Sequence, residues 1–252
     1  MDIYSFGPIA AVLDAAYSVV TALADLVEPL AGGASAALAI VLITLALRTL
    51  LIPVGISQVR AEYSRRRIAP RLQALQKKYR KNPELLQTKL MELYRDEKAS
   101  PLAGMLPTLL QAPVLSIVYG LFILQTVNGH PNALLAEQLV GASLGTSLGH
   151  LVTTGDFSLD LLVYAGLLLV IAAVAFAQRV VALRFATPLP DTALPAMARL
   201  NAWLSWLPFI TVVFAAIVPL AATLYLTVTT SWTLVERVLL RRRLAPRDAV
   251  PV

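Results

Sequence analysis

An arginine inside an apolar run is the feature of this sequence with the clearest chemical consequence. Arg48 lies in residues 34–54, which carry no other charge and are long enough to cross a bilayer. A guanidinium stays protonated in proteins, so this position carries its charge at a cost of roughly 2.5–3.5 kcal/mol on insertion scales. A charge kept in such a setting usually faces a wet cavity and serves a function. The alternative is that the long side chain of Arg48 extends to the interface near Arg60.

Other polar side chains in the apolar stretches are candidates to form one site with Arg48. Thr44 precedes Arg48 by four residues, so both lie on the same face of a helix. Gln111, Tyr119 and Gln178 lie in later apolar stretches. Each has a plainer interpretation, because a threonine in a span often bonds to its own helix backbone, and Gln178 stands beside Arg179 near the expected membrane surface.

The composition excludes several kinds of chemistry. The chain has no cysteine, so it has no disulfide, no thiol nucleophile and no cysteine metal site. Its two histidines, His130 and His150, lie in a loop-like stretch, where solvated residues are a better interpretation than metal ligands. There is no glycine-rich phosphate loop, and no Ser/His/Asp set lies within the apolar stretches. We therefore expect a protein that is not an enzyme, with no catalytic residue, metal or cofactor.

The abundance of apolar residues predicts an all-α polytopic membrane protein. Hydrophobic residues make up 58% of the chain and charged residues 14%, against about 25% charged in ordinary soluble domains. Hydropathy gives five transmembrane helices and, before them, an amphipathic helix that lies on the membrane, with a sixth span as the alternative for that helix. The expected segments are the amphipathic helix (1–33), first span (34–58), basic helical hairpin (59–100), second span (101–128), extracytoplasmic loop (129–157), third span (158–184), cytoplasmic loop (185–201), fourth span (202–218), fifth span (219–240) and basic tail (241–252).

The distribution of basic residues predicts the orientation in the membrane. Residues 1–47 and 129–158 contain no Lys or Arg, whereas residues 59–98 contain twelve against five acidic residues. Cytoplasmic segments collect Lys and Arg, so we expect the N-terminus outside and the C-terminus inside, in agreement with an odd number of spans. We expect the chain to lie in a cell membrane and to cross it several times.

The basic segment after the first span reads as a helical hairpin. Ile68, Leu72, Leu75 and Tyr79 form one apolar stripe, and a second stripe lies in residues 86–93. Between the two stripes, Asn82 is a favoured N-cap and the proline after it suits the first helical position. The outer faces are strongly basic and suit contact with anionic lipid heads. Nucleic-acid binding fits the charge less well, because few aromatic residues are present to stack bases.

Five local patterns occupy residues 43–53, 72–79, 91–98, 100–113 and 208–225. In the first, a Thr and an Arg stand four apart before a Pro. The second and third are the two hairpin helices, the fourth is a proline-containing stretch with a glutamine, and the last covers the final two spans. In this order, the five patterns resemble the YidC family of membrane protein insertases within the Oxa superfamily. The chain departs from the family at Ser100, Ala103 and Met105, and at Leu226 where members commonly have an aromatic residue.

The resemblance implies a membrane protein insertase with a hydrophilic groove that is open to the cytoplasm and to lipid. It implies that Tyr225 contacts the substrate. A fixed positive charge at Arg48 in this groove would attract an acidic residue in the short polar tail of a substrate, whose span then enters the lipid. The implied partners are nascent membrane proteins, with the Sec translocon and the ribosome open as further partners, and the implied working form is a monomer. The alternatives are a secondary transporter or channel and an assembly factor that translocates nothing.

Overall fold

Long apolar stretches make the chain mostly helical, which confirms that part of the prediction. The computed structural model describes residues 7–97, 99, 116–127, 129–155, 159–185 and 202–245. Two helical stretches, Gly7–Leu50 and Leu159–Arg184, are long and apolar enough to cross a membrane. The main helices are α1 (Gly7–Ala31), α2 (Ser35–Leu50), α3 (Ile52–Lys78), α4 (Pro83–Asp96), α6 (Leu148–Thr154), α7 (Leu159–Arg184), α9 (Ile210–Ala215) and α10 (Leu220–Leu244).

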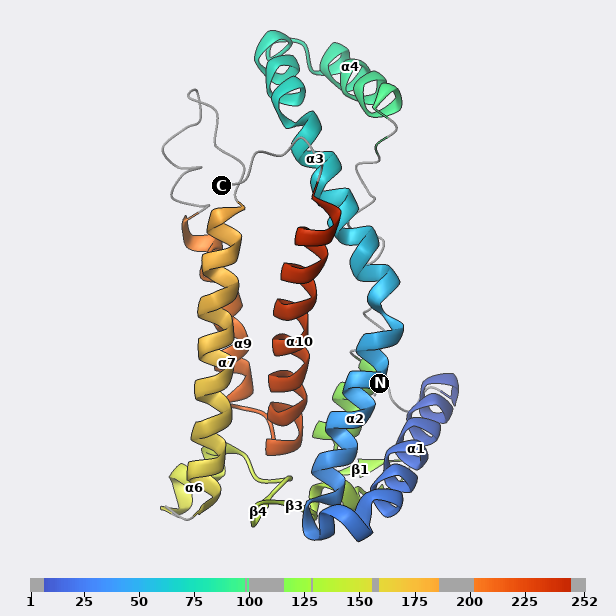
Figure 1. Ribbon diagram of the computed structural model, residues 1–252, viewed down its shortest axis with the longest axis vertical. Helices are drawn as coiled ribbons and strands as arrows, with labels where there is room; N and C mark the ends of the chain where they lie inside the picture. The colour runs from blue at the N-terminus through green and yellow to red at the C-terminus, as the bar shows by residue number, and fades with distance from the viewer. Residues whose placement is uncertain are drawn as a thin grey trace.

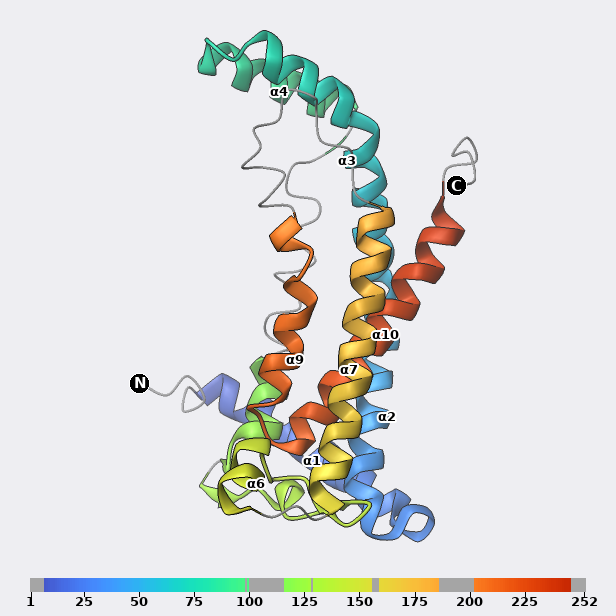
Figure 2. The same cartoon turned by 90° about the vertical axis from the view of Figure 1, so that its left-hand side faces the viewer.

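The stretch Gly7–Leu50 is divided by a sharp bend. A short 3-10 helix, η2 (Gly32–Ala34), joins α1 to α2, and Gly32 adopts a φ of +51°, which a residue with a side chain rarely adopts. The bend turns α1 back so that it packs against α2, as both views show (Figures 1 and 2). One face of α1 is buried in this contact, through Leu13, Val20, Ala24 and Val27.

The helical backbone is continuous across the expected boundary between the first span and the hairpin. Residues 58 and 59 both lie inside α3, which runs without interruption from Ile52 to Lys78. The break in the helical backbone comes earlier, at Leu51, because Pro53 has no N–H to continue the ladder of α2 and suits the first turn of a new helix. α3 therefore forms a long rod that extends away from the rest of the bundle (Figure 2).

α4 folds back along the far end of α3 (Figure 1). The expected cap is present: the Asn82 side chain accepts a hydrogen bond from the Leu85 N–H at 3.1 Å, and the following proline opens the helix. Ion pairs from Arg67 and Arg71 to Glu97 join the end of α4 to α3.

α10 is the central helix of the bundle and packs against α2, α3 and α7 (Figure 1). The segment before it is broken: residues 202–204 are helical, η4 (Leu207–Phe209) is a 3-10 turn, and α9 follows. Pro208 explains the break, since it cannot donate to the helical ladder. A tight turn at Pro219, where the expected fourth and fifth spans meet, then leads into α10.

The end of the bundle opposite α4 is closed by residues 129–155, which we call the cap. It is more ordered than the expected loop and includes η3 (Ala133–Leu135), α6 and strands outside an all-α description. β1 (Thr126–Val127), which precedes the cap, pairs antiparallel with β2 (His130–Pro131), and within the cap β3 (Gln138–Leu139) pairs with β4 (Ala142–Ser143). A two-residue turn at Val140 and Gly141, both with positive φ, joins β3 to β4.

The cap and the helices share one apolar core. Leu134, Leu144 and Leu151 of the cap are buried with Ile40 of α2 and Phe122, which belongs to the helical residues 116–123. The cap also satisfies the first turn of α10, because the N–H groups of residues 220 and 221 donate to carbonyls of residues 146 and 144, each at 2.9 Å. The described residues at this end of the bundle are therefore closely packed.

Candidate functional site: a charged cavity around Arg48

Arg48 points from the last turn of α2 toward α10. Its Nε donates a hydrogen bond to the Thr229 hydroxyl at 2.9 Å, and the side chain is half-buried. The bond fixes the direction of the guanidinium, so Arg48 faces α10.

The structure does not gather the other predicted site residues around Arg48. Thr44 is 1% exposed, and its hydroxyl donates to the Ile40 carbonyl of its own helix at 2.6 Å. Tyr225 is buried in the core, with its ring centroid 6.0 Å from that of Phe122. Tyr119 is exposed, and Gln111 lies outside the described residues.

Gln178 lies close to the site but in a separate, smaller space. Its Nε2 donates to the Thr230 carbonyl of α10 at 3.2 Å. It lines a pocket of about 30 Å³ with Arg237 and Arg241, two residues that also border the larger space around Arg48. Gln178 therefore joins α7 to α10 behind the site.

A cavity of about 550 Å³ lies between α2 and α3 on one side and α10 on the other, and we call it the arginine cavity. Half of its lining residues are charged, four of them arginines and two glutamates, so its formal charge is positive. The lining residues are Arg48, Leu51, Gly55, Gln58, Val59, Glu62, Arg65, Thr233, Glu236, Arg237, Leu240 and Arg241.

Glu236 places a carboxylate inside the arginine cavity. Its Oε2 accepts a hydrogen bond from the indole Nε1 of Trp232, one turn earlier on α10, at 2.9 Å. On the opposite wall, Gly55 leaves the space that this carboxylate occupies, because a Cβ at that position would overlap it. Arg48 and Arg237 are the cations whose charges act on Glu236.

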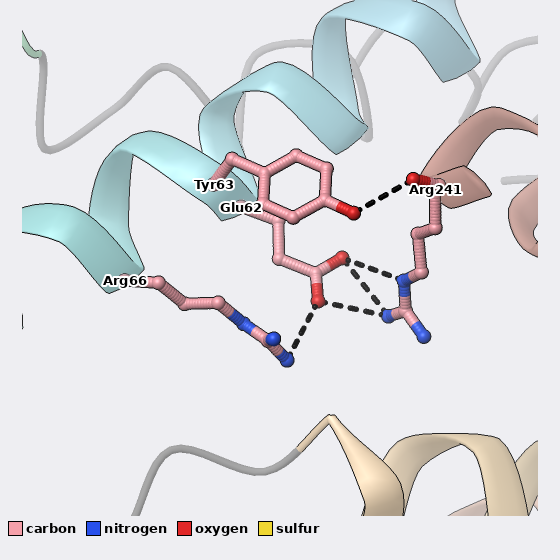
Figure 3. Close-up of polar contacts among 4 residues, drawn as sticks. All are labelled: Glu62, Tyr63, Arg66 and Arg241. Atoms are coloured by element: carbon pink, nitrogen blue, oxygen red, sulfur yellow. Dashed lines mark hydrogen bonds and ion pairs between the residues drawn. The ribbon is translucent and has the colours of Figure 1, made fainter. Parts of the chain in front are cut away.

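A second group of charges closes the wall of the cavity that lies nearest α4, and Figure 3 draws its polar members. We call it the Glu62 cluster, formed by Glu62, Tyr63, Arg66, Phe185 and Arg241. The Glu62 carboxylate accepts from Nε and Nη2 of Arg241, at distances of 2.9 to 3.2 Å, and pairs with Arg66 at 3.3 Å.

Aromatic contacts complete the Glu62 cluster. Phe185, which follows α7, stacks under the guanidinium groups of Arg66 and Arg241, 5.0 and 4.5 Å from its ring centroid. The Tyr63 hydroxyl donates to the Arg241 carbonyl at 2.8 Å (Figure 3), which satisfies one of the last carbonyls of α10. The cluster therefore holds α3, α7 and α10 together.

Sequence reasoning missed Glu62 and Glu236 because it assigned charges near the span ends to the membrane surface. A helical periodicity contained the signal. On α10, Thr229, Thr233 and Glu236 stand at i, i+4 and i+7, with Leu240 at i+11, so one face carries all four. A polar face that continues through an apolar segment indicates that the segment faces a polar interior rather than lipid.

The arrangement suits binding of a polar chain segment. The cavity presents hydrogen-bond donors and an excess of positive charge, which favour an acidic or carbonyl-rich segment. Within the residues that the structure describes, no three His, Asp or Glu side chains come together in a way that could hold a metal ion. The described cavity thus offers recognition by charge.

Comparison with known proteins gives relatives that are named as membrane protein insertases. Over 90 residues, 36% of this chain, it is 40% identical to "Membrane protein insertase YidC" of Clostridium perfringens, and the match covers 38% of that protein. It is 32% identical over 83 residues, 33% of the chain, to the protein of the same name from Fusobacterium nucleatum, of which 40% is covered. The chain is also 40% identical over 81 residues, 32% of its length, to the protein of the same name from Wolinella succinogenes. This match covers 15% of the Wolinella protein. The matches thus span less than half of these relatives.

The model of a protein family described as 60Kd inner membrane protein matches residues 27–247, nearly the whole chain. The match includes α2, α3 and α10, the helices that line the arginine cavity. The resemblance inferred from five local patterns is therefore confirmed, and the chain belongs to the 60Kd inner membrane protein family of the YidC/Oxa superfamily.

Proposed function

We propose that this protein is a membrane protein insertase that receives the short polar tail of a substrate membrane protein in the arginine cavity. The observation that carries the proposal is the inward-facing Arg48 in a cavity of about 550 Å³ with an excess of positive charge. Relatives named as insertases support it. In this mechanism, charge attracts the tail into the cavity, and the substrate span moves into the lipid because burial of its apolar surface is favourable.

We propose a matching membrane arrangement. Five spans cross the bacterial plasma membrane, the N-terminus lies outside, and α4 with the far part of α3 lies in the cytoplasm, where Lys and Arg collect. The expected division of the chain into segments belongs to this proposal. Gln111, Tyr119, Gln178 and Tyr225 are proposed to contact the substrate or to support the groove. Nascent membrane proteins are the proposed partners, and anionic lipids contact the basic hairpin.

Replacement of Arg48 tests the proposal. The assay reconstitutes the purified protein into liposomes and measures insertion of a single-span substrate whose short N-terminal tail carries two aspartates. Arg48→Ala is expected to lower the rate about tenfold, the equivalent of about 1.4 kcal/mol, and Arg48→Lys to retain most of it, because the attraction depends on charge. Arg60→Ala is the matched control, since Arg60 is exposed on α3 and lies outside the cavity lining.

Two results would contradict the proposal. Equal insertion by Arg48→Ala and the unchanged protein would remove the electrostatic role of the cavity. No insertion above that of empty liposomes by the unchanged protein would instead favour an assembly factor that translocates nothing.

A further inference from the structure

We infer that Glu236 is a built-in competitor for acidic substrate segments, which weakens the attraction of the arginine cavity for them and sets how strongly it prefers acidic over neutral tails. The inference rests on the proposed insertase function and assigns a specificity-determining residue to it. The Glu236 carboxylate lies inside the arginine cavity. The arginines of this cavity would also attract an acidic side chain of a substrate.

The position of Glu236 is fixed by two neighbours. The Trp232 indole donates to Oε2 at 2.9 Å, so one oxygen of the carboxylate is held on the α10 wall. Gly55 on the facing helix α3 has no Cβ, and the carboxylate fills the space that a Cβ would take. The side chain is half-buried rather than extended into solvent. These contacts direct the negative charge into the cavity.

The charge of Glu236 has no close ion-pair partner among the described residues, in contrast to Glu62. Each ion pair of Glu62, to Arg241 and to Arg66, is 3.3 Å or shorter. Glu236 makes its hydrogen bond to an uncharged indole. The charges that attract it belong to Arg48 of α2 and to Arg237, the next residue of α10, and both arginines line the same cavity. A carboxylate in this position lowers the positive potential near Arg48 without occupying the guanidinium donors. An incoming acidic side chain must therefore bind against the repulsion of Glu236.

The main experiment compares two versions of one single-span substrate, with either aspartates or asparagines at the same tail positions. Glu236→Gln removes the negative charge and keeps an oxygen that accepts from Trp232. In the liposome assay, this variant is expected to raise the ratio of acidic-tail to neutral-tail insertion about threefold or more, because repulsion of the acidic tail is lost. The matched control is Glu28→Gln on α1, a helix that does not line the cavity, and it is expected to leave the ratio unchanged.

A second measurement reports the electrostatic potential in the cavity and does not depend on insertion of a substrate. The chain has no cysteine, so Gln58→Cys places a single thiol in the cavity lining. The reaction rate of this thiol is compared between an anionic and a neutral methanethiosulfonate reagent. Addition of Glu236→Gln is expected to raise the anionic-to-neutral rate ratio about threefold, and addition of Glu28→Gln to leave it unchanged.

The two measurements separate the inference from the proposed function. An unchanged rate ratio at Gln58→Cys, or an unchanged tail preference in a protein that inserts both substrates, overturns the role of Glu236. A raised rate ratio in a protein that inserts neither substrate supports the electrostatic role of Glu236 and removes the insertase function instead.

Discussion

Loss of the Glu62 carboxylate is expected to destabilise the contact between α3 and α10. The side chain of Arg241 is 8% exposed, and Glu62 is the carboxylate that pairs with it. Among the residues that the structure describes, the Nη1 of Arg241 has no hydrogen-bond partner, so no second acceptor is in place there. Glu62→Gln would leave this guanidinium buried with no opposite charge, since a neutral amide oxygen cannot offset a full positive charge.

The magnitude follows from the burial of the two partners. Removal of one partner from a buried ion pair costs about 3–5 kcal/mol. The side chain of Glu62 is 32% exposed, so water can reach part of the site and the expected cost falls below that range, to about 2–3 kcal/mol. For a chain of this size, 1 kcal/mol corresponds to about 2–4 °C in Tm. We therefore expect Glu62→Gln to lower the Tm by about 4–12 °C.

The assay is thermal unfolding of the purified protein in detergent, followed by tryptophan fluorescence at constant pH and salt. Glu92→Gln is the matched control: it makes the same chemical change in the exposed pair with Lys89 on α4, and no shift in Tm is expected. The double replacement Glu62→Leu with Arg241→Met should recover most of the loss, because apolar residues of similar volume replace buried ion pairs well. A Tm for Glu62→Gln that lies within about 1 °C of the Tm of the unchanged protein, roughly the measurement error, would refute the reasoning.

Three further expectations concern the helix α4 and the end of the bundle that carries the cap. Asn132→Ala is expected to cost about 2 kcal/mol in thermal unfolding, because the buried Asn132 amide donates to carbonyls of residues 121 and 124 at 2.8 and 3.0 Å; an unchanged Tm would contradict this. Tyr164→Phe should lower the stability by about 1–2 kcal/mol, because the buried Tyr164 hydroxyl donates a hydrogen bond to the Ala215 carbonyl at 2.8 Å, beside the break before α10. Tyr17→Phe, at a half-buried position, is the control and should cost less. Amides of α4 should exchange hydrogen faster than those of α10, because α4 has no buried residue; equal protection would count against it.

Much of the fold could be predicted because it depends on local chemistry. The helical class follows from long apolar stretches, the start of α4 follows from Asn82 before a proline, and the turn into α10 follows from Pro219. The end of α2 was missed for a related reason. Hydropathy marks where an apolar stretch meets a polar one, near residue 58, whereas the backbone breaks at Leu51, where Pro53 removes a donor.

The cap could not be predicted because its order comes from contacts between distant segments. Asn132 is held by carbonyls of residues 121 and 124, Tyr17 of α1 accepts from the Ala133 N–H at 3.1 Å, and the start of α10 donates to the cap. None of these bonds has a signature in the local sequence. Without them, residues 129–155, which include five glycines, have the sequence of a loop.

The candidate site was predicted only at its first residue, for a physical reason. Arg48 stands out because a charge in an apolar run is costly, and the cost is visible in one stretch of sequence. The partners that define its cavity are visible only when two helices are placed side by side: Glu62 and Arg241 are 179 residues apart in the chain and form a bidentate pair. When Glu62 and Arg241 are considered separately in the sequence, each is interpreted as an ordinary charge at the end of a span.

The same helices that carry the charges also carry the apolar surface that an insertase needs. On α10, Glu236 faces the cavity, while Val235 and Leu239 are 56% and 48% exposed on another face. On α2, Leu50 is 75% exposed two residues after Arg48. A polar tail held in the cavity and an apolar segment attached to it would thus meet matching surfaces on adjacent faces of one helix pair. Because the opposite end of the bundle is packed, the path of least cost for the apolar segment is sideways along these exposed faces, which is the direction that the proposed function requires.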